Sequence, residues 1–385
     1  MKLLYVIVSM ELGGAEQHLL RVSTALRKRG YQPEVFAIRP DGPLTQSFVE
    51  GGVPVHGVRL PHWVSRLIRN KRMLSVLGLL CSVPALCCLY WRMRPQVTHF
   101  FLPAAYLVGG ITSLFAPAMK RGMSRRSLNL YQSKHGWSRR LEQWLHSKMN
   151  FVSGNSQAVV QDLLDEGVRQ DKIRLIYNGV NFDRFDSARS RPQVRALLGI
   201  PDETLVFAIV ANLIPYKGHA DLIEAFGRVR AQLPAPWVCL FIGRDDGIGR
   251  SLQEQADALG VGGNIRFLGS RSDVPDLLCA ADIGVLCSHE EGFSNAILEA
   301  MAAQLPMVVT RVGGNAEVVL DGETGRVVAP HAPDELAQAL LAVALDSSRR
   351  AMGVAGRHRV ETLFSMSACL QAYDDLYRGS DHHAA

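Results

Sequence analysis

The chain has 385 residues, of which 48% are hydrophobic and 20% are charged. This length exceeds what one hydrophobic core usually serves, and the composition excludes an intrinsically disordered protein, so we expect two globular domains. The seven cysteines are odd in number and lack paired Cys-x2-Cys spacing, which excludes a disulfide framework and a cysteine-type zinc site.

Charge is spread unevenly along the chain. Residues 1–185 hold 25 basic and 11 acidic side chains, whereas residues 186–385 hold 17 and 25. Between Arg59 and Lys148 there are fifteen basic residues and a single acid, Glu142. Such a field favours an anionic partner: phospholipid head groups, a lipid diphosphate or nucleic acid. No nucleic-acid-binding module is recognisable, so we expect no nucleic-acid partner.

The chain opens with an apolar strand predicted over residues 3–10, followed by Gly13, Gly14 and a helix to about residue 29. Strand, glycine-rich turn and helix is the phosphate-binding arrangement of a Rossmann-like unit. Two ordinary turn glycines would give the same pattern, so the motif alone leaves both interpretations open. The short apolar run has no small-residue cleavage site, which favours a first strand over a signal peptide and indicates a cytoplasmic protein.

Further strands alternate with helices through the first half of the chain. We predict them at residues 34–38, 53–58, 96–101, 128–133, 151–153 and 173–177. This alternation is typical of a parallel, doubly wound sheet. His135 follows the strand predicted at 128–133, and the carboxyl end of a parallel strand is where α/β sheets bind ligands.

One stretch of this half, Met73–Trp91, carries no charge over nineteen residues. A buried crossover helix, a helix lying in the membrane interface and a transmembrane span all fit its composition. Gly78 and Pro84 interrupt the stretch and soluble strands flank it, which disfavours a span. Basic residues surround it and would contact lipid phosphates in the interfacial case: Arg66, Arg69, Lys71, Arg72, Arg92 and Arg94.

The second half repeats the alternation, with strands predicted at residues 205–211, 237–243, 265–269, 283–287 and 307–310. A second parallel, doubly wound sheet follows from this pattern. We therefore predict a first domain over residues 1–185, a second over residues 186–365, and a C-terminal helix and tail, residues 366–385, that packs back on the first domain.

The most informative segment is SHEEGFSNAILEAMAA, residues 288–303, which follows an apolar strand. Ser294 and Asn295 favour the start of a helix there, and the free N–H groups of a helix start bind phosphate. Glu299 within the helix can accept hydrogen bonds from a ribose diol, and Glu291 in the loop can reach a second sugar. A nucleotide-diphosphate sugar has this order of groups. Helix electrostatics also favours acids near a helix start, so the spacing alone does not decide.

The wording EGFSNAILEAMAA resembles the Glu-x7-Glu signature of retaining glycosyltransferases of family 4. The resemblance spans nearly the whole chain and is strongest from residue 212 to 325. It implies the GT-B fold, an α/β architecture of two Rossmann-like, doubly wound parallel-sheet domains facing a cleft. It also implies a retaining hexosyltransferase that needs neither metal nor cofactor. Such an enzyme moves a hexose from a nucleotide sugar, with UDP favoured, to a lipid-linked or membrane-adjacent glycan acceptor in polysaccharide or glycolipid assembly.

The same resemblance assigns site residues. Lys217 falls on the lysine of the family motif Gly-Arg-Leu-x3-Lys-Gly, but Asn212 stands in place of its arginine and removes one cation from the diphosphate. The catalytic residues it implies are Glu291, His135 and Lys217. The donor-binding residues it implies are Gly13, Gly14, Asn212, Lys217, Phe293, Ser294, Asn295 and Glu299.

Other functions compete with this one. A nicotinamide-dependent dehydrogenase would need G-x-G-x-x-G after a strand, with an acid about 20 residues later, and the chain lacks that pattern. A non-catalytic nucleotide-sugar-binding or membrane-scaffold protein of the same fold is favoured only by Asn212. Because the first domain is so basic, we also expect the protein to dock on an anionic membrane surface from the cytoplasmic side.

Overall fold

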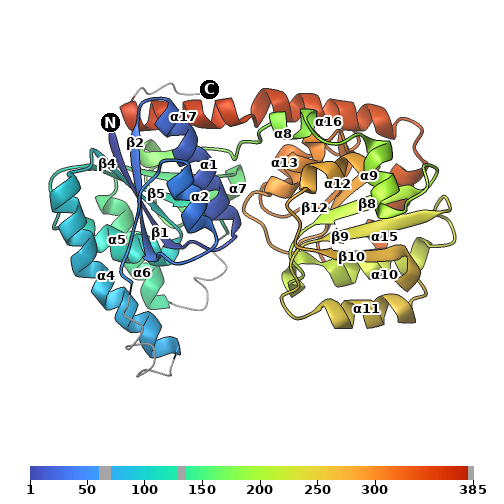
Figure 1. Cartoon of the computed structure of the whole chain (residues 1–385), viewed down its shortest axis with the longest axis horizontal. Coiled ribbons are helices and arrows are strands. Elements are labelled where there is room, and N and C mark those ends of the chain that lie inside the picture. Colours follow the sequence, from blue (N-terminus) through green and yellow to red (C-terminus); the bar gives the residue numbers. More distant parts are fainter. Residues whose placement is uncertain (60–70, 129–135, 380–385) are drawn as a thin grey trace. The chain divides into compact units, whose positions relative to one another are not determined.

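The computed structural model describes residues 1–59, 71–128 and 136–379, which form two compact units (Figure 1). The first unit is Met1–Tyr177 with Leu370–Ala385, and the second is Asn178–Cys369. The division therefore falls after Tyr177 rather than after the predicted residue 185. Only the part of the C-terminal segment from Leu370 onward belongs to the first unit.

The first unit is a parallel sheet of seven strands in the order β3-β2-β1-β4-β5-β6-β7. Helices cover both faces of this sheet (Figure 1). The strands are β1 (Lys2–Ser9), β2 (Gln32–Arg39), β3 (Val55–His56), β4 (Val97–Phe101), β5 (Lys120–Arg125), β6 (Phe151–Gly154) and β7 (Ile173–Leu175). The helices are α1 (Gly14–Lys28), α2 (Leu44–Glu50), α4 (Lys71–Met93), α5 (Pro103–Ser113), α6 (Gly136–Lys148), α7 (Gln157–Asp165) and α17 (Met366–Arg378), which begins in the second unit.

Strand β5 lies where the sequence did not predict a strand. Its sequence, KRGMSR, has one large apolar residue, yet Met123, Ser124 and Arg125 are buried. The strand predicted at residues 128–133 is wrong at Leu128, which is not in a strand, and its remaining residues lie outside the described part of the chain. His135 also lies outside it. The error arose because polar residues fill a central strand that we expected to be apolar.

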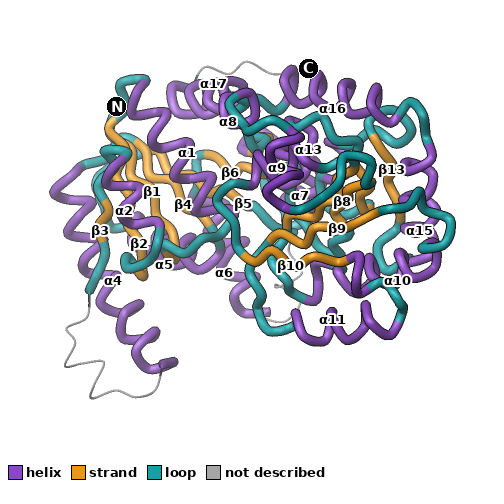
Figure 2. The backbone as a smooth tube through the Cα atoms, turned by 45° about the vertical axis from the view of Figure 1, so that its right-hand side comes forward, coloured by secondary structure: helices purple, strands orange, loops and turns teal. Residues whose placement is uncertain are grey.

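Helix α4 has two different halves. From Ser82 onward it packs into the core of the first unit through Leu86, Tyr90 and Met93, as a buried crossover helix does. Its first half projects beyond the neighbouring helices (Figures 1 and 2), and Val76 and Leu80 are 56% and 63% exposed. Among the described helices, α4 alone is long and apolar enough to cross a membrane, judged by length and composition. Of its 18-residue apolar stretch Val76–Met93, 28% is buried. The crossover-helix prediction thus holds for only half of the segment.

The second unit is a parallel sheet of six strands in the order β10-β9-β8-β11-β12-β13. Its first five strands were predicted, whereas β13 was not. The strands are β8 (Leu205–Val210), β9 (Trp237–Ile242), β10 (Ile265–Gly269), β11 (Ile283–Leu286), β12 (Met307–Thr310) and β13 (Gly325–Val328). The helices are α8 (Asp183–Asp186), α9 (Arg191–Leu198), α10 (His219–Val229), α11 (Gly249–Ala258), α12 (Val274–Ala280), α13 (Asn295–Ala302), α14 (Asn315–Val318), α15 (Pro333–Leu345) and α16 (Arg349–Leu363).

The two sheets are wound in the same way. In each, the chain first builds outward from a central strand, β1 or β8, and then returns to build the other side, beginning with β4 or β11. The strand order reverses between these neighbours, and the crevice outside the carboxyl ends of the strands at such a point is where doubly wound sheets bind ligands. In the second unit, the loops that follow β8 and β11 therefore meet at this switch point.

Candidate active site in the second unit

The loops after β8 and β11 bring together two predicted catalytic residues. Lys217 Nζ lies 2.6 Å from Glu291 Oε1, and the two side chains are 18% and 12% exposed. The hydroxyl of Ser288 donates a hydrogen bond of 2.9 Å to the same carboxylate oxygen. Glu291 is thus held in place by a cation and a hydroxyl, and the partly buried pair lies at the switch point of the sheet.

Close backbone contact fixes this pair. The backbone N–H of His289 donates to the carbonyl oxygen of Tyr216 over 2.7 Å, which joins the two loops directly. Gly218 has φ +73°, and a Cβ there would lie 2.0 Å from the carbonyl oxygen of Cys287. Gly313 lies in the loop after β12, and a Cβ there would lie 2.0 Å from the carbonyl oxygen of Glu291. Only glycine permits such approaches, so the three loops pack as one surface.

Helix α13 begins as the sequence predicts. Ser294 is its N-cap residue, and the side-chain amide of Asn178 donates to Asn295 Oδ1 over 2.8 Å. The ring of Phe293 is 6% exposed and packs 5.5 Å from that of Phe364. A donor could therefore use the backbone at Phe293 but not its ring. Glu299 is partly buried one turn into the helix.

Asn212 lies in the loop after β8. It stands at the position where the family motif has an arginine. Its Oδ1 accepts a hydrogen bond of 3.1 Å from the backbone N–H of Arg244, in the loop after β9. The Arg244 guanidinium pairs with Asp246 at 2.7 Å and is 54% exposed. A basic side chain absent from the motif is thus present on the neighbouring loop.

The remaining predicted donor residues belong to the first unit. Gly13 is the N-cap residue of α1, and a Cβ there would lie 2.2 Å from Glu16 Oε2. Glu16 is buried, which raises the pKa of its carboxyl group, and it accepts a hydrogen bond of 3.3 Å from Ser9. Within 4 Å, nothing would touch a Cβ at Gly14. Contact with Glu16 therefore explains why glycine occupies position 13, whereas local packing gives no reason for glycine at position 14.

Two family models match the chain, one in each half. The model described as "Glycosyltransferase Family 4" matches residues 12–184, and "Glycosyl transferases group 1" matches residues 190–359. Each half of the chain thus belongs to a glycosyltransferase family, the first half to family 4 and the second half to group 1. Its two Rossmann-like units are those of the GT-B fold.

Known relatives of this glycosyltransferase include two D-inositol 3-phosphate glycosyltransferases. That of Corynebacterium jeikeium is 33% identical over 64% of this chain and 61% of its own length. That of Saccharomonospora viridis is 33% identical over 54% of this chain and 50% of its own length. The chain thus spans about half to three-fifths of these relatives. Anabaena HepE, solved in complex with UDP, has a TM-score of 0.83 at 22% identity and covers 98% of this chain and 100% of its own.

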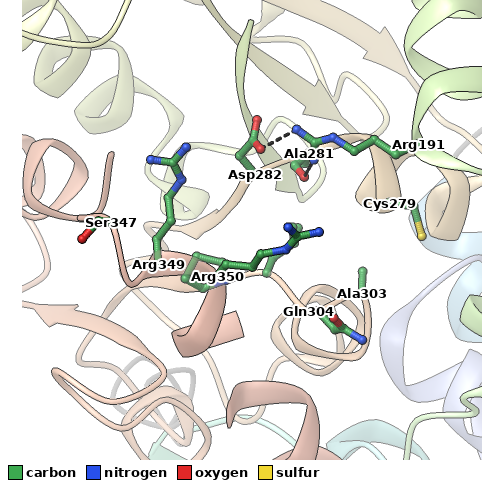
Figure 3. A pocket seen from close by; sticks show the side chains of 11 residues that line it. Arg191, Cys279, Ala281, Asp282, Ala303, Gln304, Ser347, Arg349 and Arg350 are labelled. Atoms are coloured by element: carbon green, nitrogen blue, oxygen red, sulfur yellow. Dashed lines mark hydrogen bonds and ion pairs between the residues drawn. The ribbon is translucent and has the colours of Figure 1, made fainter. Parts of the chain in front are cut away.

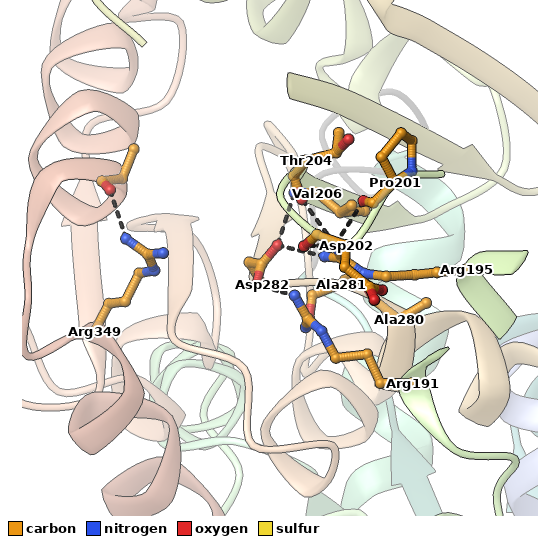
Figure 4. A network of polar contacts seen from close by, with 11 residues as sticks. Arg191, Arg195, Pro201, Asp202, Thr204, Val206, Ala280, Ala281, Asp282 and Arg349 are labelled. Atoms are coloured by element: carbon orange, nitrogen blue, oxygen red, sulfur yellow. Dashed lines mark hydrogen bonds and ion pairs between the residues drawn. The ribbon is translucent and has the colours of Figure 1, made fainter. Parts of the chain in front are cut away.

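A cavity of the second unit is lined by residues other than those of the loops after β8 and β11; Figure 3 shows its lining. Its volume is about 520 Å³. It lies at the amino ends of β11 and β12, whereas the loops that carry Lys217 and Glu291 follow the carboxyl ends of the strands. Its charged lining consists of Arg191, Asp282, Arg349 and Arg350. Asp282 accepts from both Arg191 and the buried Arg195, whose guanidinium also donates to the carbonyl oxygens of Thr204 and Ala280 (Figure 4). The side chains of Arg191 and Arg195 hydrogen-bond to residues at the amino ends of the strands and in neighbouring loops. We therefore assign these arginines a structural role.

Sequence analysis missed several groups beside the predicted site. Asp221, His289 and His331 come from separate segments of the second unit, yet their ligand atoms all lie within 4.8 Å of one another. His219 follows Lys217 closely and is 1% exposed, and burial, aided by Lys217, lowers its pKa to about 4. His289 lies two residues before Glu291, which could have drawn attention to it. The convergence of the other two residues has no signal in the sequence.

Proposed function

We propose that this glycosyltransferase is a retaining hexosyltransferase that uses a UDP-sugar as donor. The observation that carries the proposal is the Lys217–Glu291 pair, 2.6 Å apart at the switch point beside the start of α13. A cation and a helix N-terminus side by side suit a diphosphate. The crystallised complexes of HepE with UDP and with UDP-glucose support uracil as the base.

In this proposal each residue acts on one part of the donor. Lys217 and the N–H groups at the start of α13 stabilise the negative charge that grows on the diphosphate leaving group. Glu299 binds the ribose diol, and Glu291 contacts the hexose and faces the positive charge that develops at its anomeric carbon. Asn212 can donate an amide hydrogen bond but brings no charge. We name no side-chain base, because the donor phosphate can accept the proton of the attacking hydroxyl in front-face transfer.

Lys217 also bears on the need for a metal. A divalent cation would serve the diphosphate in the same way as the lysine and the helix start do together. We therefore propose transfer without Mg²⁺ or Mn²⁺, so that EDTA leaves the rate unchanged. A strict requirement for either ion would contradict this account.

We propose an anionic acceptor at the membrane surface, a lipid-linked glycan in polysaccharide or glycolipid assembly. The fifteen basic residues from Arg59 to Lys148 and the exposed apolar half of α4 support this choice. The names of the relatives also point to a phosphorylated acceptor. We therefore also propose that the protein is a peripheral protein at the cytoplasmic face of a membrane.

A donor panel tests the proposal. Purified protein is incubated with UDP-, GDP- and ADP-hexoses and a lipid diphosphate acceptor, and the anomeric configuration of the product is read by NMR. We expect turnover with a UDP-hexose and retention at the anomeric carbon. Inversion would refute the retaining assignment. Donor binding without transfer to any acceptor would favour a non-catalytic nucleotide-sugar-binding protein, the alternative that Asn212 raises.

A further inference from the structure

Three metal-ligating side chains converge on the second unit outside the proposed donor contacts. Asp221 lies in the first turn of α10, His289 in the loop after β11, and His331 in the loop between β13 and α15. His289 Nε2 and Asp221 Oδ2 are 2.9 Å apart, with the two side chains 16% and 22% exposed. The rings of His289 and His331 have centroids 3.6 Å apart. One atom from each residue lies within 4.8 Å of the other two.

We propose that Asp221, His289 and His331 form a zinc site. Two imidazoles and one carboxylate are a common zinc ligand set with water as the fourth ligand, whereas Mg²⁺ and Ca²⁺ prefer oxygen ligands. The set is partly exposed, which leaves room for that water. The three ligands lie beside the proposed donor contacts but are not among them, and the ion would not take part in glycosyl transfer.

The three ligand atoms need to move only slightly to reach the distances of a tetrahedral zinc site. Ligand atoms about 2.0 Å from a tetrahedral zinc ion lie about 3.3 Å from one another. The His289–Asp221 separation of 2.9 Å must open slightly, and the ion replaces the proton that the two atoms share. The ligand nitrogen of His331 must approach from at most 4.8 Å, and this residue is exposed and therefore able to move.

The backbone of His331 gives a further reason to look for a ligand. Its φ of +57° lies in the left-handed region, which non-glycine residues adopt uncommonly. A hydrogen bond between Asp221 and His289 accounts for those two residues but not for a histidine in this conformation above them. A third ligand to a shared ion accounts for it.

Zinc titration of the untagged protein, with no nucleotide present, tests the site. His331→Gly is the decisive variant, because glycine keeps the left-handed backbone without strain and so preserves the fold. We expect wild type to bind one equivalent of Zn²⁺ at the cluster and His331→Gly to bind it at least about tenfold more weakly. Cobalt substitution should give the visible absorption of a four-coordinate ion in wild type only, and excess Mg²⁺ should not displace zinc.

Three matched controls separate other causes. Gln304→Gly also relieves a left-handed residue, φ +61°, but removes no ligand, so zinc binding should stay unchanged. His358→Ala removes an exposed histidine on α16, with the same expectation. Replacement of the adjacent His382 and His383 by alanine removes the other obvious ligands of the sequence. Equal zinc affinity in wild type and His331→Gly, or loss of the single equivalent in the His382/His383 variant, would overturn the proposal.

Discussion

The two sheets share one winding order but differ in what fills their centres. In the second unit, the central strands β8, β11 and β12 read LVFAIV, IGVL and MVVT and pack into an apolar core. In the first unit, β4 and β5 bury His99, Ser124 and Arg125 among the apolar residues. The same topology can thus be supported by apolar packing or partly by buried hydrogen bonds.

Buried polar groups of the first unit are paired with one another. Ser124 Oγ lies 2.8 Å from His99 Nε2 and 2.6 Å from Ser153 Oγ. The Arg125 guanidinium binds Glu166 at 2.7 Å and Glu142 at 3.0 Å, with all three side chains almost fully buried. Removing one partner of such a set leaves a buried charge or donor unsatisfied, which costs several kcal/mol. The first unit is therefore the more sensitive to changes of charge.

Acidification should destabilise the first unit more than the second. Burial lowers the pKa of His18 well below its usual value and that of His99 to about 3, and in the second unit burial lowers that of His219 to about 4. The unfolded chain binds protons at these sites below pH 6.5, so stability is lost as the pH falls from 6.5 toward the folded pKa values. From pH 7 to pH 5 we expect the free energy of opening to fall by about 4 kcal/mol in the first unit and by about 2 kcal/mol in the second.

Native-state hydrogen exchange followed by mass spectrometry measures this difference, with peptides from β4–β6 compared with peptides from β8–β9. Between pH 7 and 8, above the titration range of these histidines, neither set should change in opening free energy. An equal loss in both units at pH 5 would show that the buried histidines do not distinguish them.

A glycine substitution tests how tightly the loops of the second unit are packed. Gly218→Ala should lower the free energy of unfolding by about 3 kcal/mol, since a Cβ would meet the Cys287 carbonyl oxygen and φ is +73°. Gly199→Ala is the control, because Gly199 has φ +60° with open space around it and reports strain alone. Urea unfolding of both variants measures the difference. Equal destabilisation would mean that the loops after β8 and β11 are not tightly packed.

Replacement of Lys217 by alanine should lower kcat by about 100-fold with a smaller effect on KM, since charge grows on the leaving group in the transition state. Lys217→Arg keeps a cation and should recover part of kcat. Steady-state kinetics over a range of donor concentrations separates the two constants. A change confined to KM would assign Lys217 to ground-state binding instead.

The projecting half of α4 should carry the membrane contact of the first unit. Val76, Leu80 and Val83 are exposed at i, i+4 and i+7, which places them on one face of the helix. Replacing all three with glutamine should weaken binding to anionic vesicles by about 2 kcal/mol, or about thirtyfold. In the second unit, Leu345→Gln with Val354→Gln removes exposed apolar side chains too and should change nothing. Unaltered sedimentation of the α4 variant with vesicles would argue against this contact.

Sequence patterns predicted the second unit better for a physical reason. Its central strands are continuous apolar runs, which such patterns detect. Strand β5, KRGMSR, is set by pairing with β4 and β6 and by buried ion pairs, none of which has a local signature. At the site, the motif located Lys217 and Glu291, and the switch point explains their contact. The cluster of Asp221, His289 and His331 comes from one helix and two loops that are far apart in the sequence, so only the structure reveals it.

The central claim is that the donor nucleotide binds the second unit at the start of α13, and calorimetric titration of UDP tests it most directly. Glu299→Ala should weaken UDP binding by about 1.5–3 kcal/mol, or about 10- to 150-fold, with an unchanged unfolding midpoint, because a charged acceptor for the ribose hydroxyls is lost. Glu254→Ala, an exposed acid on α11, should bind UDP as wild type does. Unchanged UDP affinity in a folded Glu299→Ala protein would contradict the account.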